Sequence, residues 1–377
     1  MKKLAVLGGS YLQLPLVQKA EQKGIEVHCF AWDDGRAVCK QYASHFYPIS
    51  VLEKDQIFEI CKEIEIDGIT TIATDICIPV IAAISSELNL KGNSINTAYL
   101  TTDKGKMRKL LLDNMLNSPH SKVFSNSFSD LELENLSEKF KFPLIVKPLD
   151  RSGSIGVTIV ENVSELRSAL ISALDFSINK QAIVEEFIDG QEISVETISF
   201  NGRHKILAVT DKVITTPPHF VELAHHQPSK LSDNILRNVE NDTLKILNAA
   251  GIQNGASHLE FKINNKSEIY LIEIGSRMGG DFIGSDLVEL STGIDFVSAV
   301  IDIALGQFNW EQVDEKFKKY SGIYFLSKET ESLLPYFEDE LDWIVKKEIL
   351  NPELSWARSS NDRSGYLIYQ SDQKINI

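Results

Sequence analysis

Two glutamates in one segment of the chain have the type and spacing of metal ligands. Residues 257–284 contain two runs with strand-like alternation around a turn rich in Asn and Lys, a pattern that predicts a β-hairpin. Glu260 lies in the first run and Glu273 in the second. Carboxylates held close together repel each other unless a cation lies between them, and their hard oxygen atoms suit Mg²⁺ that carries the phosphates of a nucleotide. A solvated strand face is the plainer interpretation of the same two residues.

The register of this hairpin decides whether the two carboxylates can meet. A turn centred on Asn265–Lys266 predicts that Glu260 faces Leu271. His258 then faces Glu273, and the two glutamates are diagonal neighbours on one face, on the order of 7 Å apart. A slip of one residue would move them to opposite faces.

Three cationic side chains could bind an anion near such a site. Lys147 interrupts the apolar run FPLIVKP, where a lysine needs an anion or a polar cleft because its burial without a partner is costly. Lys104 falls in the first turn of a helix predicted to begin after Asp103, where free backbone N–H groups also attract anions. Arg277, in the glycine-rich turn after the hairpin, could clamp a carboxylate or a phosphate.

A candidate phosphate loop follows the strand that contains Lys147. Its sequence, DRSGSIGV, has small residues at Ser152, Gly153, Ser154 and Gly156. Loops of this composition let backbone amides close over phosphate oxygens. An ordinary hairpin loop is the alternative.

Two other motifs raise the question of a zinc site and of a dinucleotide site, and their spacing argues against both. Residues 214–231 are predicted to be irregular because three prolines forbid a regular element. The histidines of this stretch, His219, His225 and His226, match no common zinc-ligand spacing. Gly8-Gly9-Ser10 follows the first predicted strand, but the dinucleotide pattern GxGxxG is absent, which favours a simple strand-to-helix turn.

The order of the elements predicts two kinds of sheet. In the first hundred residues, strands at 4–7, 25–30 and 68–73 alternate with helices at 12–23, 53–64 and 78–88. This alternation predicts a parallel sheet covered on both faces. Farther on, runs at 192–200 and 204–214 flank Asn201-Gly202, which predicts a hairpin with a type I′ turn. The change from parallel to antiparallel pairing places a domain boundary near residues 100–117.

Composition excludes several classes of protein. With 377 residues the chain is long enough for two or three domains. A net charge of −15 argues against a nucleic-acid partner. The four cysteines lack CxxC spacing and are expected to be buried thiols in a reducing compartment. No run is long enough to span a bilayer, so we expect no membrane partner and a cytoplasmic location.

Taken in order, five motifs of the chain resemble those of the ATP-grasp superfamily. They are TTDKGKMRKLL, FPLIVKP, SGSIGV, VEEFIDGQEISVE and the pair HLEFK with IEIGSRMGG. The resemblance implies an α/β protein with a pre-ATP-grasp parallel-sheet domain followed by an ATP-grasp fold of two α+β subdomains. The domains implied are residues 1–100, the two ATP-grasp subdomains 101–190 and 191–310, and a C-terminal segment, 311–377, packing on the body.

The same resemblance assigns roles to individual residues. It implies phosphate contacts from Lys104, Lys147 and the loop at Ser152, Gly153, Ser154 and Gly156. It implies an adenine border at Glu185, Glu186, Phe187 and Ile188, ribose binding by Glu192, and metal binding by Glu260 and Glu273. It implies Arg277, with Gly279 and Gly280, as the substrate clamp, and we add Lys212, His225 and His226 as further candidates for binding nucleotide or substrate.

One departure bears on the reaction. Many ATP-grasp enzymes have asparagine two residues after the second metal glutamate, but this chain has Gly275 there. The pattern Glu-Ile-Gly-x-Arg-x-Gly-Gly is closer to the carboxylate–amine (L-amino-acid) ligase branch, which implies ATP, Mg²⁺ (with Mn²⁺ as a substitute), and a carboxylic acid and an amine, such as two amino acids, as substrates. Arg277 and Lys147 would be the catalytic residues, acting through an acyl phosphate. The alternatives left open for the function are a bicarbonate-activating carboxylase of the same superfamily and a non-catalytic ATP-binding regulator. A homodimer is the assembly that we consider.

Overall fold

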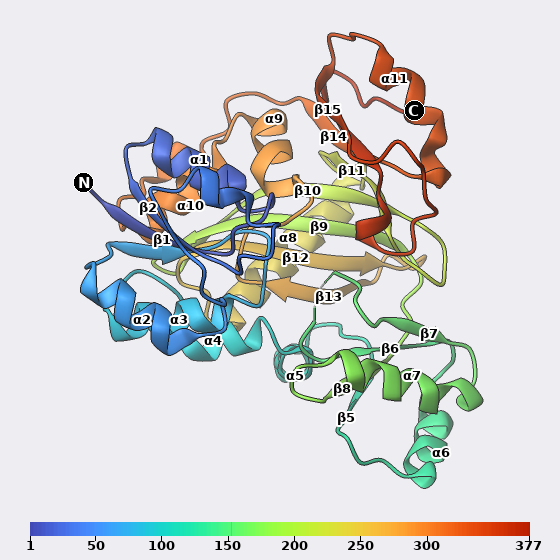
Figure 1. The fold of residues 1–377 in the computed structure, drawn as a ribbon. Helices are drawn as coiled ribbons and strands as arrows, with labels where there is room; N and C mark the ends of the chain where they lie inside the picture. Colours follow the sequence, from blue (N-terminus) through green and yellow to red (C-terminus); the bar gives the residue numbers. More distant parts are fainter. Residues whose placement is uncertain (152) are drawn as a thin grey trace.

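The computed structural model describes residues 1–151 and 153–377, and within them the strands form three sheets (Figure 1). The first is a four-stranded parallel sheet, the second a four-stranded antiparallel sheet, and the third an eight-stranded antiparallel sheet. This arrangement confirms the predicted fold class. The boundaries drawn between domains stay a prediction.

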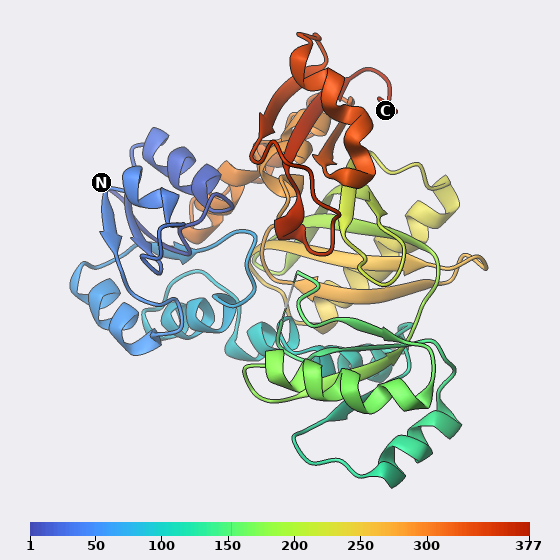
Figure 2. The same ribbon diagram turned by 45° about the vertical axis from the view of Figure 1, so that its right-hand side comes forward.

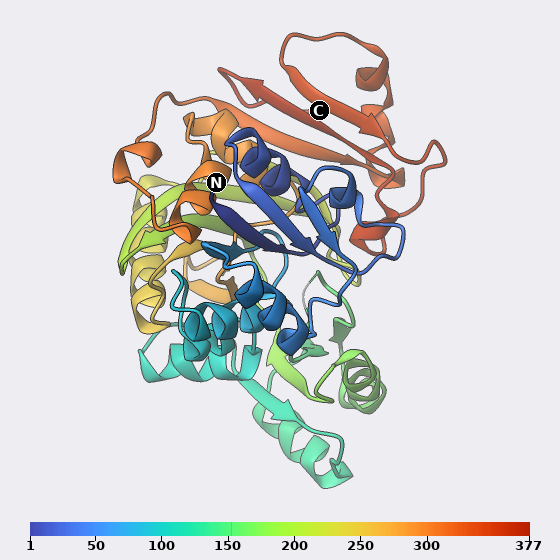
Figure 3. The same cartoon turned by 60° about the vertical axis from the view of Figure 1, so that its left-hand side comes forward.

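The parallel sheet has the order β3-β2-β1-β4 and lies at the front of Figure 3. Its elements are β1 (Lys3–Leu7), α1 (Leu14–Gln22), β2 (Glu26–Phe30), β3 (His45–Tyr47), α2 (Lys54–Glu63), β4 (Gly68–Thr70), α3 (Ile78–Glu87) and the short α4 (Ile95–Leu100). Residues 4–7 of β1 are fully buried, because helices cover both faces of the sheet. The strand expected at 68–73 ends at Thr70, and Ala73 has a positive φ of 59°.

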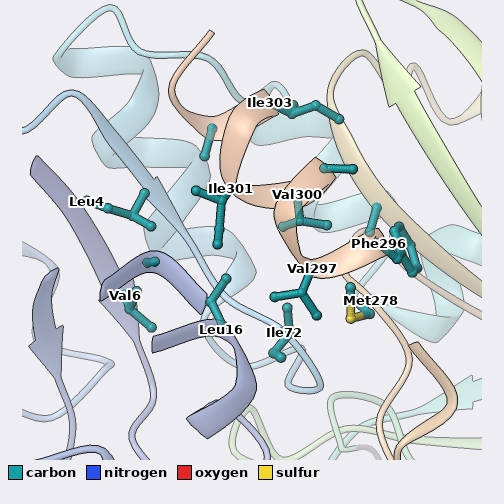
Figure 4. Packing of buried hydrophobic residues seen from close by; sticks show 14 of the residues in the cluster. Leu4, Val6, Leu16, Ile72, Met278, Phe296, Val297, Val300, Ile301 and Ile303 are labelled. Atoms are coloured by element: carbon teal, nitrogen blue, oxygen red, sulfur yellow. The ribbon is translucent and has the colours of Figure 1, made fainter. Parts of the chain in front are cut away.

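One helix over this sheet comes from the far end of the chain. Side chains of α10 (Phe296–Ala304) form a common core with those of β1 and α1, and Met278 closes it from the turn after the predicted hairpin (Figure 4). The opposite face packs on α2 and α3. The parallel sheet is therefore completed by residues more than two hundred positions away from it.

The second sheet has the order β5-β8-β6-β7 and lies next to the third sheet's hairpin strands (Figure 2). Its elements are α5 (Lys104–Asp113), β5 (Ser121–Phe124), α6 (Asp130–Lys139), β6 (Leu144–Pro148), β7 (Thr158–Val160), α7 (Val163–Phe176) and β8 (Ala182–Glu186). The apolar faces of α6 and α7 cover the sheet. Lys147 lies near the end of β6, on the strand predicted for it.

The third sheet has the order β13-β12-β9-β10-β11-β14-β16-β15. Its elements are β9 (Gln191–Phe200), β10 (Arg203–Ile214), β11 (Glu222–Gln227), α8 (Asp233–Ala249), β12 (Gly255–Ile263), β13 (Ile269–Gly275), α9 (Val288–Thr292), β14 (Tyr320–Leu326), α11 (Leu334–Glu338), β15 (Ile344–Ile349) and β16 (Gly365–Ser371). Asn201 and Gly202 both have positive φ, at 51° and 75°, and Phe200 pairs with Arg203, which confirms the type I′ turn.

The prediction that residues 214–231 are irregular is wrong. This stretch contains strand β11, which pairs with β10 and β14. Its prolines lie on either side of this six-residue strand rather than within it, so they bound the element instead of preventing it.

Two further expectations concern the cysteines and the membrane. All four cysteines are buried and free, as predicted. None of the helices in the described residues combines the length and the apolar character needed to cross a bilayer.

The close packing of β4 on α10 generates a test of the fold. A methyl group added at Gly68 would lie 2.5 Å from the backbone carbonyl oxygen of Ala304, which cannot move without shifting α10. We expect Gly68→Ala to lower the unfolding free energy by about 1–3 kcal/mol, the usual cost of overpacking. The measurement is the midpoint of urea unfolding.

Gly280→Ala is the matched control. Its added methyl would meet no atom closer than 3.5 Å, so the unfolding midpoint should stay near that of the unmodified chain. Equal midpoints for the two variants would show that α10 does not pack on β4 in this way.

Candidate active site

The two glutamates of the hairpin lie directly opposite each other. Glu260 on β12 pairs with Glu273 on β13, whereas Phe261 pairs with Leu271. The register therefore shifts between Glu260 and Phe261, and Ile272 is an extra residue, a β-bulge. The expected pairings of Glu260 with Leu271 and of His258 with Glu273 are wrong, since His258 pairs with Gly275. Strict alternation cannot anticipate such a bulge.

Each of the paired carboxylates contacts its own lysine. Lys212 Nζ lies 2.9 Å from Glu260 Oε1, and Lys104 Nζ lies 3.0 Å from Glu273 Oε1. Like charges directly opposite each other on a sheet are destabilising, so these cations stabilise the pair. Lys212 also contacts Glu192 at 2.7 Å. Burial opposes the charged form of Lys212, but the surrounding carboxylates outweigh it and raise its pKa well above the ordinary value.

One cavity between the second and third sheets collects most of the predicted site residues. It is lined by positively charged, negatively charged and apolar side chains. Among the predicted residues, the lining includes Lys104, Lys147, Gly153, Ser154, Glu185, Glu186, Phe187, Ile188, Glu192, Lys212, Glu260, Glu273, Gly275 and Arg277. Ser152 lies outside the described residues.

The glycine loop beside this cavity has a left-handed backbone at three positions. Gly153, Ser154 and Gly156 have positive φ of 67°, 56° and 72°. Successive N–H groups in such conformations can form a concave site for an anion. Gly156 itself packs closely, since an added Cβ would lie 2.9 Å from side-chain atoms of both Pro148 and Phe176.

A buried ionic cluster links the second sheet to the hairpin. Glu185 Oε2 lies 2.7 Å from Lys147 Nζ, and Glu185 Oε1 accepts a hydrogen bond of 2.6 Å from Arg108 Nε. Arg108 Nη2 donates to the carbonyl oxygen of the bulge residue Ile272 at 2.7 Å. Burial alone would raise the pKa of Glu185, but Arg108 and Lys147 outweigh it and lower that pKa to about 2.

Sequence reasoning missed Arg108. It lies four residues after Lys104 on α5, so both side chains share one face of the helix. A second cation at that spacing in TTDKGKMRKLL was the available signal. Because Arg108 is 2% exposed and fully partnered, it holds the bulge and Glu185 in place rather than meeting a ligand.

Arg277 is held by a carboxylate from the first hundred residues. Its Nε donates to Asp75 Oδ1 at 2.9 Å and its Nη2 to Asp75 Oδ2 at 2.7 Å. A Cβ added at Gly275 would lie 2.5 Å from Asp75 Oδ1. The glycine that replaces the usual asparagine therefore leaves room for this ion pair. No sequence motif pointed to Asp75.

A buried histidine lies beside the first glutamate of the pair. His258 Nδ1 hydrogen-bonds to Glu196, and its Nε2 lies 3.3 Å from Glu260 Oε1. Burial opposes protonation, but Glu196 outweighs it, and the pKa of His258 is raised to about 9. Glu196 also accepts the Gly279 N–H at 3.0 Å, so it ties β9 to the turn that contains Arg277.

Four predicted substrate residues lie elsewhere. Gly279 and Gly280 line a separate small cavity with Tyr11 and Phe282. His226 Nδ1 lies 3.0 Å from the Tyr369 hydroxyl oxygen, and burial lowers the pKa of this histidine to about 3.

His225 is also buried, with Nε2 3.6 Å from Asp281 Oδ2. Neither histidine lines the cavity between the second and third sheets, because β11 turns both into packed interior regions.

The comparisons with known proteins agree with this geometry. Residues 140–286 match the family model described as an ATP-grasp domain. Alanine–anticapsin ligase of Bacillus amyloliquefaciens is 27% identical over 273 residues, which are 66% of this chain and 56% of that protein. The chain thus spans about half the length of the curated relatives it matches first.

Two solved structures have the same fold. The L-amino acid ligase of Bacillus licheniformis superposes with a TM-score of 0.79 at 22% identity, covering 99% of this chain and 94% of that one. N5-carboxyaminoimidazole synthetase of Staphylococcus aureus, complexed with ADP, has a TM-score of 0.79 at 15% identity, with coverages of 99% and 94%. These matches agree with the resemblance drawn from the motifs: residues 140–286 match an ATP-grasp domain, and the two solved structures share the fold of nearly the whole chain.

Proposed function

We propose that this chain is an ATP-dependent carboxylate–amine ligase that forms an amide or peptide bond and releases ADP and orthophosphate. The observation that supports it most is the pairing of Glu260 with Glu273 in a cavity that also contains Lys104, Lys147 and Arg277. Such a cavity can hold a polyanion next to a second, smaller anion. The alanine–anticapsin and L-amino acid ligases among the relatives favour amino acids as the acid and the amine.

We expect each part of the nucleotide to meet a different group of the residues that line the cavity. Lys104, Lys147 and the backbone amides near Gly153 would contact the phosphates. Phe187 and Ile188 offer apolar surface for adenine, and Phe220 lies 5.8 Å from Phe187, ring centroid to ring centroid. Glu192 would accept ribose hydroxyls.

The donor set of the hairpin fits Mg²⁺. Glu260 and Glu273 provide carboxylate oxygens from directly opposite positions, and hard oxygen ligands with bound phosphates are what this ion prefers. When bound, the ion would neutralise charge on the phosphates. Gly275 supplies no side-chain ligand, so water or phosphate oxygens would complete the coordination.

The reaction would need two steps because hydroxide is a poor leaving group. A carboxylate oxygen of the acid attacks the γ-phosphorus of ATP, the bond to ADP breaks, and an acyl phosphate forms. The amine then attacks the acyl carbon, loses a proton and expels orthophosphate. Arg277, fixed by Asp75, would hold the carboxylate and then the oxygens of the acyl phosphate.

Phosphate release in the presence of paired amino acids tests this proposal. We expect orthophosphate and ADP in equal amounts, together with an amide, only when an acid and an amine are both present. Formation of AMP and pyrophosphate would exclude the acyl phosphate. A requirement for bicarbonate would indicate a carboxylase, and ATP binding without turnover for any pair would indicate a regulator.

The metal assignment predicts the effect of Glu273→Gln. Removing one charged ligand should lower the Mg²⁺-dependent rate of phosphate release by about a hundredfold or more, since several kcal/mol of transition-state stabilisation are lost. The rate is measured across a Mg²⁺ titration with circular dichroism as a check on folding.

The matched control is Glu268→Gln, on the exposed turn of the same hairpin. Its rate should equal that of the unmodified chain. A silent Glu273→Gln would contradict the metal role of the pair.

The substrate clamp predicts a different kinetic pattern. Arg277→Lys keeps the charge but loses the planar two-point grip, so the KM of the acid should rise and kcat should fall. Asp75→Asn should change both constants in the same direction by freeing the guanidinium. Affinity for a non-hydrolysable ATP analogue, measured by calorimetry, should hardly change in either variant.

Arg203→Lys, at an exposed arginine of β10, is the control and should leave all three quantities unchanged. A collapse of nucleotide affinity in Arg277→Lys would show that this arginine serves ATP instead of the acid.

A further inference from the structure

Three potential metal ligands meet at the edge of the parallel sheet, apart from the cavity between the second and third sheets. Glu26 and His28 lie two residues apart on β2, on one face of the strand, and His45 on the edge strand β3 pairs with His28. One ligand atom from each lies within 4.8 Å of the other two. Among the described residues, those lining that cavity all lie at position 104 or later in the chain.

The distances around Glu26 resemble those between ligands of a tetrahedral ion. Its Oε1 lies 3.2 Å from His28 Nε2 and 3.1 Å from His45 Nε2. Ligand atoms about 2.0–2.2 Å from a tetrahedral zinc ion lie roughly 3.3–3.6 Å apart. The two imidazole rings are stacked with centroids 4.7 Å apart, so a modest shift of one ring would bring the third pair of atoms to that separation.

The buried histidine is already oriented for this role. Its Nδ1 lies 3.1 Å from the Tyr47 hydroxyl oxygen, an interaction that fixes the ring and turns Nε2 towards Glu26. His28 is 2% exposed, and its Nε2 makes no hydrogen bond within the described residues. Glu26 Oε1 lies 3.2 Å from this nitrogen without hydrogen-bond geometry, and a metal ion between the two atoms would satisfy both.

The exposed His45 lets an ion reach the three ligands and can change its own ring position. The His45 side chain is 52% exposed, so an ion can reach the site from solvent and the ring can move without disturbing the core. β3 is a three-residue strand at the edge of its sheet, with few backbone bonds to hold it.

We propose that Glu26, His28 and His45 bind a Zn²⁺ ion, with water as the fourth ligand, and that the ion fastens β3 to β2. Two imidazole nitrogens and a carboxylate suit zinc, whereas the all-oxygen pair at Glu260 and Glu273 suits magnesium. The two sites are therefore distinguishable by metal as well as by position.

Cobalt, a coloured substitute for zinc, provides the test. We expect the full chain, titrated with Co²⁺ in saturating Mg²⁺, to bind one Co²⁺ ion per chain. The bound ion should absorb visible light as strongly as tetrahedrally coordinated Co²⁺ does, and Zn²⁺ should displace it. His45→Ala and Glu26→Gln should each weaken binding by about tenfold or more. Because His45 is exposed, its replacement should leave the fold intact, as circular dichroism will check.

His219→Ala, at an exposed histidine of another segment, is the matched control and should bind Co²⁺ normally. Zn²⁺ should also raise the melting temperature of the unmodified chain but not that of His45→Ala. Absence of Co²⁺ binding, unchanged affinity in both ligand variants, or an absorption band typical of thiolate ligands would overturn the proposal.

Discussion

The site depends on keeping two like charges opposite each other. Glu260 and Glu273 repel across paired strands, and the chain offsets this with Lys212 from β10 and Lys104 from α5. Both lysines come from outside the hairpin, so the pair is stable only when three parts of the chain are assembled. In the proposed function, the phosphates and the metal would replace these contacts, lysine binding phosphate and carboxylate binding metal.

Two further ion pairs hold the surrounding elements. Arg108 joins α5 to β8 through Glu185 and to the bulge through the Ile272 carbonyl. The ion pair of Asp75 with Arg277 joins the segment after β4 to the turn that follows β13. Next to this ion pair, the Ala73 N–H donates a hydrogen bond of 3.0 Å to the Met278 carbonyl oxygen. The proposed nucleotide and acid sites are therefore positioned by different parts of the chain, which is why their variants should affect different kinetic constants.

The sequence predicted the elements with regular patterns and failed where geometry depends on distant partners. The buried run of β1 and the Asn201-Gly202 turn follow local rules, so both were predictable. The bulge at Ile272 was not predictable, because the alternation of polar and apolar residues does not show where a strand has an extra residue.

The residues of the candidate site also fall into predictable and unpredictable ones. Lys147 could be predicted because a lysine in an apolar strand demands an anion. Asp75 could not, because an acidic residue after a short strand is common and its partner lies 202 residues away. His225 and His226 were candidates for substrate binding in a segment predicted to be irregular, whereas strand β11 buries both.

Isotope transfer tests the central claim, that the acid is activated by phosphoryl transfer, most directly. An acid labelled with ¹⁸O in its carboxylate is supplied with ATP, Mg²⁺ and the amine, and the released orthophosphate is examined by mass spectrometry. If an acyl phosphate forms, one carboxylate oxygen leaves with the phosphate, so the orthophosphate should carry one ¹⁸O atom per turnover. Orthophosphate free of ¹⁸O, formed together with amide, would contradict the account.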